Sequence, residues 1–200
     1  MRRTLKKIAL SLSLLLFLSV LFVGPLHCAE TVEDLITFTP PKGWVKVKSK
    51  PETPVRIYIP HNSPKAGVRV SLAINEKCQP GLGPRQYGFK NIVRFFGMAD
   101  RAVATAQKEG KTLQRDKFNC ETFKASFRFE DAQMHALKIS RPFPYGSAFK
   151  AYVFRIAFSD KGVCYRLTLQ GPEEVIHHYT DSVFKSFGQT IFKEMKEAKK

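Results

Sequence analysis

The sequence predicts an α+β protein with a central antiparallel β-sheet flanked by helices. Several segments alternate apolar and polar side chains, and two longer segments repeat apolar residues at helical spacing. These segments follow one another as strands, helix, strands, helix, an order typical of an antiparallel sheet with helices packed on it. No internal repeat or long linker divides the chain, so one such domain is expected.

The composition fits that class. The 200 residues are 44% hydrophobic and 25% charged, which suits one globular domain and excludes a disordered chain. Four cysteines exclude a disulfide-dense scaffold. The formal net charge is +16, of which four positive charges precede residue 8. Residues 30–200 keep 29 basic and 17 acidic side chains, a net charge of +12. The chain is therefore expected to be compact, soluble and basic.

The N-terminus predicts export. Residues 1–7 are basic, residues 8–23 are apolar apart from three serines, and the first acid is Glu30. This layout is typical of a secretory signal, so we expect a signal peptide over residues 1–29 and a domain over 30–200. The protein is then periplasmic or secreted. An uncleaved membrane anchor, the cleavage site and lipidation of Cys28 stay open. Lipidation is the less favoured reading, because His27 precedes Cys28 where lipoprotein signals have a small residue.

Alternation predicts strands over residues 55–59, 68–74, 123–129, 149–158 and 163–169. The apolar set Val55, Ile57 and Ile59 should face the core, with Arg56 outward. The short gap after residue 158 predicts an antiparallel hairpin between the last two strands. Basic residues on the outward strand sides form a candidate basic surface, provided that no helix covers it: Lys46, Lys48, Arg69, Lys124, Arg128, Arg155 and Arg166.

Two helices are predicted. Pro84 suits a first helical turn, and the following apolar face comprises Phe89, Ile92, Val93, Phe96 and Ala99. Gly97 is where this helix could break. The second helix begins at residues 171–174, where Glu173 and Glu174 complement the positive end of the helix dipole. Its apolar face ends at Phe187, and residues 193–200 form a charged helical tail.

The order of elements resembles a known family. A proline turn ends in Gly43-Trp44 between the first two strands, and Gly171-Pro172-Glu173-Glu174 leads from a strand into the last helix. These features are similar to the PsbP-like family, named for an extrinsic photosystem II subunit, whose fold is shared with a Ran-binding nuclear import factor. The resemblance spans roughly residues 35–190. It implies an α/β/α sandwich and a binding or assembly role without catalysis, and it supplies no catalytic residues.

No motif predicts catalytic residues, a metal site or a cofactor. The histidines His61, His135, His177 and His178 form no catalytic signature with a cysteine, and neighbouring helical residues diverge by about 100°, which separates His177 from His178. Cys78, Cys120 and Cys164 would meet an oxidising compartment. A disulfide between Cys120 and Cys164 is our first choice, because both fall in predicted strands. The other pairings, and three idle thiols, stay open.

The sequence thus favours an exported, non-enzymatic binding or assembly protein whose partner is an unidentified envelope protein or an anionic surface. One alternative is a basic domain that binds lipid headgroups, lipopolysaccharide or nucleic acid, although a specific nucleic-acid partner does not suit an exported chain. A second alternative is a small extracytoplasmic hydrolase. Arg141, Phe143 and Tyr145 form a candidate partner-binding loop, because two prolines restrict it and keep aromatic side chains available.

Overall fold

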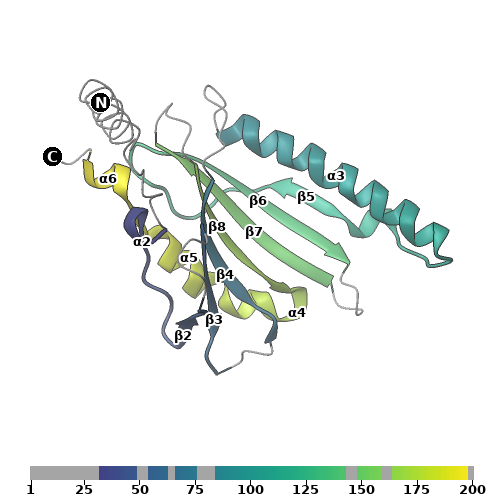
Figure 1. Cartoon of the computed structure of the whole chain (residues 1–200), viewed down its shortest axis with the longest axis horizontal. Coiled ribbons are helices and arrows are strands. Elements are labelled where there is room, and N and C mark those ends of the chain that lie inside the picture. The colour runs from purple at the N-terminus through teal and green to yellow at the C-terminus, as the bar shows by residue number, and fades with distance from the viewer. Residues whose placement is uncertain are drawn as a thin grey trace, which may run out of the picture. The chain divides into compact units, whose positions relative to one another are not determined.

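A seven-stranded antiparallel sheet lies at the centre of the chain (Figure 1). The computed structural model describes residues 32–48, 54–62, 66–75, 84–142, 148–158 and 164–197. All of them belong to one compact unit, Thr31–Lys200. The predicted signal peptide and the boundary at residue 29 lie outside the described residues. In the described part of the chain, no helix is long and apolar enough to cross a membrane.

The sheet has the strand order β2-β3-β4-β8-β7-β6-β5. Its strands are β2 Trp44–Lys46, β3 Val55–Pro60, β4 Arg69–Asn75, β5 Asn119–Thr122, β6 Gln133–Pro142, β7 Ala148–Ala157 and β8 Cys164–Pro172. A small second sheet pairs β1 Ile36–Thr37 with β9 Ile191–Phe192. Strands β7 and β8 form the predicted hairpin. The α+β class predicted from the sequence is confirmed.

Helices lie against both faces of the large sheet (Figure 1). The helices are α2 Val32–Leu35, α3 Pro84–Lys108, α4 Glu173–Ile176, α5 Thr180–Gly188 and α6 Lys193–Glu197, with 3₁₀ turns at Arg115–Lys117 and His177–Tyr179. Helix α3 runs unbroken through Gly97. The predicted second helix instead consists of α4, a 3₁₀ turn and α5. Because α3 packs on β5, β6 and β7, it covers only one side of its sheet face.

The main core fills the face beneath α4 and α5. Alternate residues of β4, β7 and β8 point into it, as predicted, and include the fully buried Leu72, Phe154 and Leu167. The rings of Phe154 and Phe187 meet edge to face, with centroids 5.5 Å apart. This aromatic packing fixes α5 on the sheet.

The predicted orientation of β3 is wrong. Arg56, Tyr58 and Pro60 are the buried residues, whereas Val55, Ile57 and Ile59 are half-buried on the other face. Tertiary context explains the reversal: Arg56, only 8% exposed, donates to Val32 O at 2.7 Å and to Ile36 O. The guanidinium thereby connects β3 to the first residue of α2 and the first residue of β1.

Residues 123–129 do not form the predicted strand, although their alternating apolar residues pack against the main core. The ladder between β5 and β6 ends at Thr122 and Leu137, followed by one bond from Phe123 N to Ala136 O at 3.1 Å. The chain then leaves β6, because Phe127 and Phe129 turn into the main core. The Phe129 ring meets the Phe192 ring of β9 at 5.2 Å.

The predicted disulfide between Cys120 and Cys164 is wrong. Cys120 is a free, buried thiol, whereas Cys164 is disulfide-bonded. The register aligns Cys120, through Ile139 and Ala151, with Gln170 rather than Cys164. Three strand spacings of about 4.8 Å separate the two cysteines across the sheet. A disulfide requires Cα atoms within about 7 Å. Cys78 and Cys28 lie outside the described residues.

Candidate functional site

Helix α3 carries three parallel rows of side chains. Its inner row contains Gly88, Phe95 and Ala99, all buried against the sheet. Successive helical residues are about 100° apart, so positions four and seven apart share one side. The inner row and the residues it meets on β5, β6 and β7 form a second, smaller core that includes Leu137 and Val153. One side of α3 is therefore fully used for packing.

The second row is apolar and exposed. Phe89 is 66% exposed and Val93 is 57% exposed, and Phe96 continues their row as a half-buried residue. The sequence pattern wrongly predicted that Phe89 and Val93 face the core. They lie too far around the helix from Phe95 and Ala99 to reach the sheet. No signal in the pattern separates the two sets, because a broad apolar face is also typical of a buried helix.

The third row is basic. Lys90, Arg94, Arg101 and Lys108 are exposed and share one side of α3, next to the apolar row. The whole helix carries five basic residues and one acid, Asp100. That acid binds Arg115 Nε at 2.5 Å, and the Arg115 guanidinium also lies 4.7 Å from the Phe96 ring centroid. The exposed half of α3 thus combines large apolar side chains with a strong excess of positive charge.

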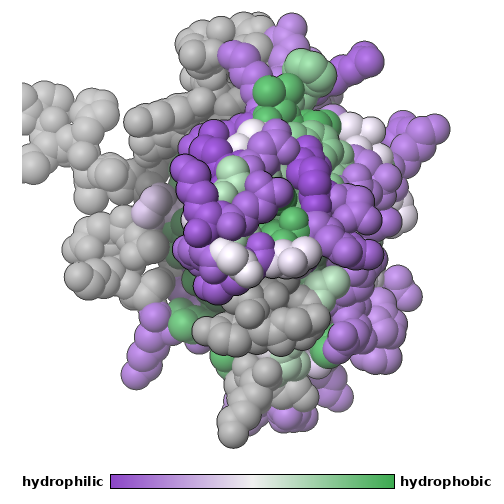
Figure 2. All heavy atoms as spheres, turned by 90° about the vertical axis from the view of Figure 1, so that its right-hand side faces the viewer, coloured by the Kyte–Doolittle hydropathy of each residue, from purple (hydrophilic) through white to green (hydrophobic). Residues whose placement is uncertain are grey.

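We call Phe89, Val93, Lys90, Arg94, Arg101 and Lys108 the α3 surface. Figure 2 shows the end of the molecule where the C-terminal part of α3 lies, with hydrophobic side chains that emerge in separate places among hydrophilic ones. Exposed apolar residues are ordinary when scattered singly, whereas Phe89 and Val93, four residues apart, lie on the same side of α3. The sequence pattern did not reveal the α3 surface.

His135 of β6 fixes the position of α3. A Cβ atom at Gly88 would lie 1.9 Å from His135 Cδ2 and 2.1 Å from Nε2, so the helix and the imidazole are in direct contact. On β7, Arg155 Nη2 donates to Asn91 Oδ1 at 3.1 Å. Burial, followed by the positive charges of Arg155 and Arg85, lowers the pKa of His135. The imidazole of His135 is therefore a packed group between β6 and α3.

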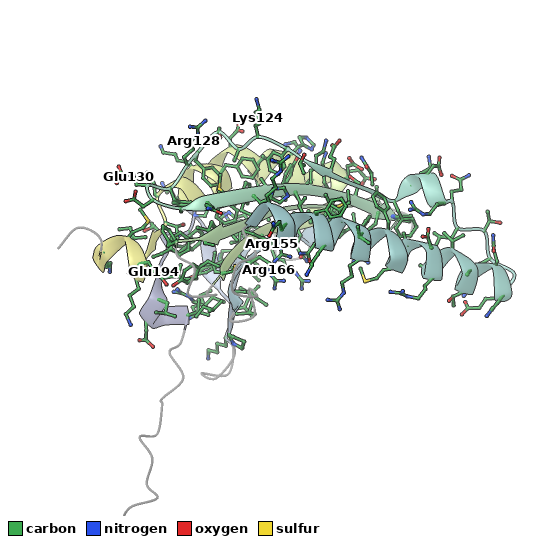
Figure 3. All side chains as sticks on the ribbon, turned by 90° about the horizontal axis from the view of Figure 1, so that it is seen from above. Lys124, Arg128, Glu130, Arg155, Arg166 and Glu194 are labelled. Carbon is green, nitrogen blue, oxygen red and sulfur yellow. The ribbon has the colours of Figure 1, made fainter. Side chains whose placement is uncertain are left out.

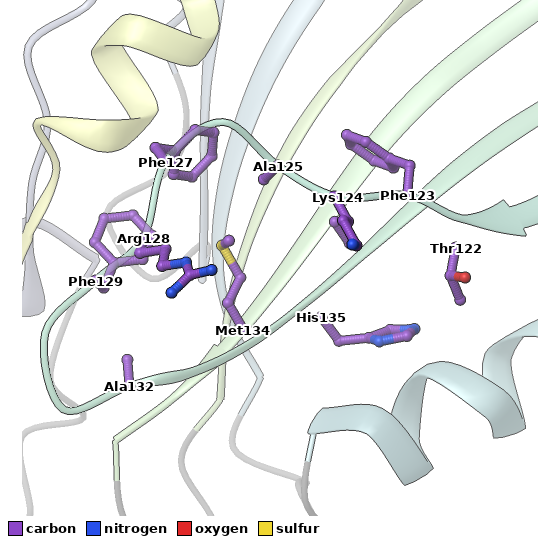
Figure 4. Close-up of a pocket in the computed structure, with 11 residues that line it drawn as sticks. Thr122, Phe123, Lys124, Ala125, Phe127, Arg128, Phe129, Ala132, Met134 and His135 are labelled. Carbon is purple, nitrogen blue, oxygen red and sulfur yellow. The ribbon is translucent and has the colours of Figure 1, made fainter.

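A pocket of about 460 Å³ lies where the chain leaves the edge of β6 (Figure 4). Its apolar wall includes Phe127, Phe129 and Met134, and His135 lies at its side next to α3. Lys124 and Arg128 also line it. Both are exposed, and among the described residues neither forms an ion pair or hydrogen bond. We call this space the β6-edge pocket.

The predicted basic residues do not form one surface. Arg155 is only 7% exposed beneath α3, and Arg166 beside it on β8 is half-buried. Figure 3 shows these two in the middle of the molecule, while Lys124 and Arg128 project from one edge. The condition for one basic surface, that no helix covers it, is not met, because α3 lies on the sheet face that holds Arg155. Three other predicted basic residues are exposed: Lys46 on β2, Lys48 just after β2, and Arg69 on β4.

Of the predicted partner-binding loop, only Arg141 is described. It is exposed near the end of β6, and its guanidinium lies 4.6 Å from the Phe149 ring centroid. Phe143 and Tyr145 lie outside the described residues. The expected separation of His177 from His178 is wrong: their ring centroids are 3.9 Å apart, because the two residues lie in an exposed 3₁₀ turn rather than in an α-helix. Within the described ranges, no three His, Cys, Asp or Glu residues gather as a possible metal site.

No family model matches the sequence, and no curated protein matches it. Solved structures do resemble the fold. LpqN of Mycobacterium tuberculosis, described as involved in cell envelope biogenesis, is 12% identical, with a TM-score of 0.45 over 78% of this chain and 81% of that one. Cyanobacterial PsbP from Synechocystis sp. PCC 6803 is 14% identical, with a TM-score of 0.44 over 84% of this chain and 96% of that one.

The Ran-binding protein Mog1p of Saccharomyces cerevisiae is 9% identical, with a TM-score of 0.43 over 78% of this chain and 85% of that one. The structures found include a PsbP and a Ran-binding protein, the two kinds of protein named in the resemblance stated from the sequence. The likeness concerns the arrangement of strands and helices alone. Any function must therefore come from the residues of this chain.

Proposed function

We propose that this chain is a non-catalytic binding protein that acts outside the cytoplasmic membrane and attaches to an anionic membrane surface through the α3 surface. The observation that carries the proposal is the exposure of Phe89 and Val93 beside a row of four cations on the same helix. Helices that lie in a membrane interface combine an apolar row with lysine and arginine in this way.

Both kinds of side chain would contribute to attachment. Each lysine or arginine near an anionic surface contributes about 1 kcal/mol, so the basic row supplies about 4 kcal/mol at low salt. Burying a whole Phe or Val side chain contributes about 1.5–3 kcal/mol. Phe89 and Val93 expose more than half of their surface, so together they add roughly 2–4 kcal/mol. Binding should therefore weaken with salt without vanishing.

Two further observations support the location. Residues 1–29 have the layout of an export signal. Cys164 is disulfide-bonded, and disulfides persist in oxidising compartments outside the cytoplasm. The anionic surface meant here is a lipid bilayer. A protein partner that binds the same apolar row is the competing account, which the following experiment separates from ours.

The test is sedimentation of the compact unit Thr31–Lys200 with anionic and neutral phospholipid vesicles across a range of salt. The charge variant Lys90→Gln/Arg94→Gln should weaken binding to anionic vesicles roughly 30-fold at low salt, the equivalent of about 2 kcal/mol. Its matched control, Lys48→Gln/Lys185→Gln, removes two exposed charges elsewhere and should bind nearly as the parent protein does.

The apolar row has its own variant. Phe89→Ser/Val93→Ser should reduce binding at high salt most, because salt screens only the charges. The control Ile191→Ser removes another exposed apolar side chain, 40% exposed on β9, and should have no effect. Equal binding to neutral and anionic vesicles would overturn the proposal. So would no binding at low salt, which would favour a protein partner instead.

A further inference from the structure

We propose that the β6-edge pocket binds a single-chain amphipathic anion, with the aliphatic chain on the phenylalanine wall and the carboxylate or phosphate head between Lys124 and Arg128. This site is separate from the α3 surface and does not rest on vesicle attachment. It concerns one ligand molecule held in a cavity, whereas the α3 surface concerns contact with an extended bilayer.

The pocket is a consequence of how residues 123–129 run. Pairing with β6 stops after Ala136 accepts from Phe123 N, and the chain returns to β6 only at Gln133, after a turn in which Asp131 has a φ of 55°. Between those points β6 has no neighbouring strand on its outer side. The chain cannot close this gap, since Phe127 and Phe129 are held by rings of α5 and β9. The cavity is thus built into the fold.

The wall of the pocket suits an aliphatic chain. Phe127 meets Phe154 at 5.0 Å and Phe129 meets Phe192 at 5.2 Å, so both rings are fixed from behind by the main core. Met134 and Ala132 complete the apolar lining. A volume of about 460 Å³ falls within the range of about 300–1,000 Å³ that small-ligand pockets occupy. Rigid rings and a flexible methionine are well suited to a hydrocarbon chain of variable shape.

The charge at the pocket specifies the head of the ligand. Lys124 and Arg128 come from the same extended segment, four residues apart, and Figure 4 shows both side chains drawn at the pocket. In the part of the chain that the structure describes, no carboxylate neutralises either of them. Two cations beside an apolar wall attract an anion that carries an apolar tail, and charge-assisted hydrogen bonds to its oxygens would hold the head.

The test is calorimetric titration of the compact unit Thr31–Lys200 with decanoate and with decyl phosphate, each below its micellar concentration. Both should bind at one site. Decanol lacks the charge, whereas acetate and inorganic phosphate lack the tail, and all three should bind at least about tenfold more weakly. A preference between decanoate and decyl phosphate identifies the head group. Equal binding of decanol and decanoate would overturn the proposed role of the two cations.

Variants locate the site. Lys124→Gln/Arg128→Gln should weaken decanoate binding at least about tenfold, and Ala132→Leu, which fills the pocket, should abolish it. The control Lys48→Gln/Lys185→Gln should change nothing. Phe89→Ser/Val93→Ser should keep decanoate binding while weakening vesicle binding at high salt, so failure of this proposal and failure of the proposed function are distinguishable. Decanoate binding that survives both pocket variants would overturn the assignment, and thermal unfolding would show that each variant folds.

Discussion

Two glycines of α3 should respond in opposite ways to the same substitution. Alanine is favoured over glycine within a helix by about 1 kcal/mol. At Gly97 a new Cβ atom would meet only Arg101 Nη1, at 3.8 Å. Gly97→Ala should therefore stabilise the protein by about that amount. At Gly88 the same atom would lie 1.9 Å from His135 Cδ2 and 2.8 Å from its Cγ. Because Cγ is the first atom of the ring, turning the ring about its own axis cannot relieve the clash.

The steric cost at Gly88 decides whether Gly88→Ala raises or lowers the free energy of unfolding. Overpacking of this kind costs about 1–3 kcal/mol. The free energy of unfolding of the Gly88→Ala variant should therefore be lower than that of the Gly97→Ala variant by about 1–3 kcal/mol. For a domain of this size, each kcal/mol shifts the Tm by about 2–4 °C, and the two variants should differ by roughly 2–12 °C. Thermal unfolding followed by circular dichroism measures this difference directly.

A double-mutant cycle identifies the cause. In a His135→Ala background the ring is gone, and Gly88→Ala should then stabilise the protein, as Gly97→Ala does in the parent. A coupling energy of about 1–3 kcal/mol is expected for groups in direct contact. The reasoning would be refuted if Gly88→Ala raised the Tm as much as Gly97→Ala, or had the same effect with and without the imidazole.

Two other predictions concern titratable groups. Burial first, and then the charge of Glu121, raises the pKa of the Cys120 thiol to about 11. Iodoacetamide should therefore label Cys120 slowly in the native protein and rapidly after unfolding. Cys164 should be labelled only after reduction of its disulfide. Peptide mass mapping that finds Cys164 alkylated without reductant would contradict that disulfide. The lowered pKa of His135 means that, as the pH falls through about 6.5, the unfolded chain takes up the proton first. Stability should thus be full above that pH and decline below it until the folded form is also protonated. His135→Gln should flatten the dependence of Tm on pH between about 7 and 5, while His61→Gln, at an exposed histidine, should leave it unchanged; equal profiles for both variants would refute the assignment.

The sequence predicted burial correctly wherever the alternating apolar residues of a strand are the buried ones. Strands β4, β7 and β8 have apolar residues on alternate positions, and those residues fill the main core. It failed at β3, where Val55, Ile57 and Ile59 also alternate but occupy the less buried face. The alternation shows that a strand has two unlike sides, and only its neighbours decide which side is inside. Arg56 is buried on the inner side, where it donates to carbonyl oxygens of residues 24 and 20 positions away in the sequence.

The prediction of a disulfide between Cys120 and Cys164 was wrong for a different reason. Both Cys120 and Cys164 lie in strands, as predicted, but the choice between pairings depends on the order of strands in the sheet. Strands β6 and β7 lie between them, an arrangement that short-range patterns do not specify. The same order explains why the basic residues separate: Arg155 belongs to a strand beneath α3, whereas Arg69 belongs to one that α3 does not contact closely.

The two sides of α3 can be changed independently, and this links the stability of the fold to its proposed attachment. The inner row is fixed by Gly88, Phe95 and Ala99, so substitutions there change the unfolding free energy. Phe89 and Val93 contact water over most of their surface, and surface substitutions of that kind usually change stability by less than about 0.5 kcal/mol. A protein under no selection to bind through this helix would lose little by replacing both with polar residues. Their presence beside four cations is therefore better explained by contact with an apolar, anionic partner than by folding. High-salt vesicle binding that is weakened in Phe89→Ser/Val93→Ser without a change in Tm, and a Tm that changes in Gly88→Ala without a change in vesicle binding, would together establish that separation.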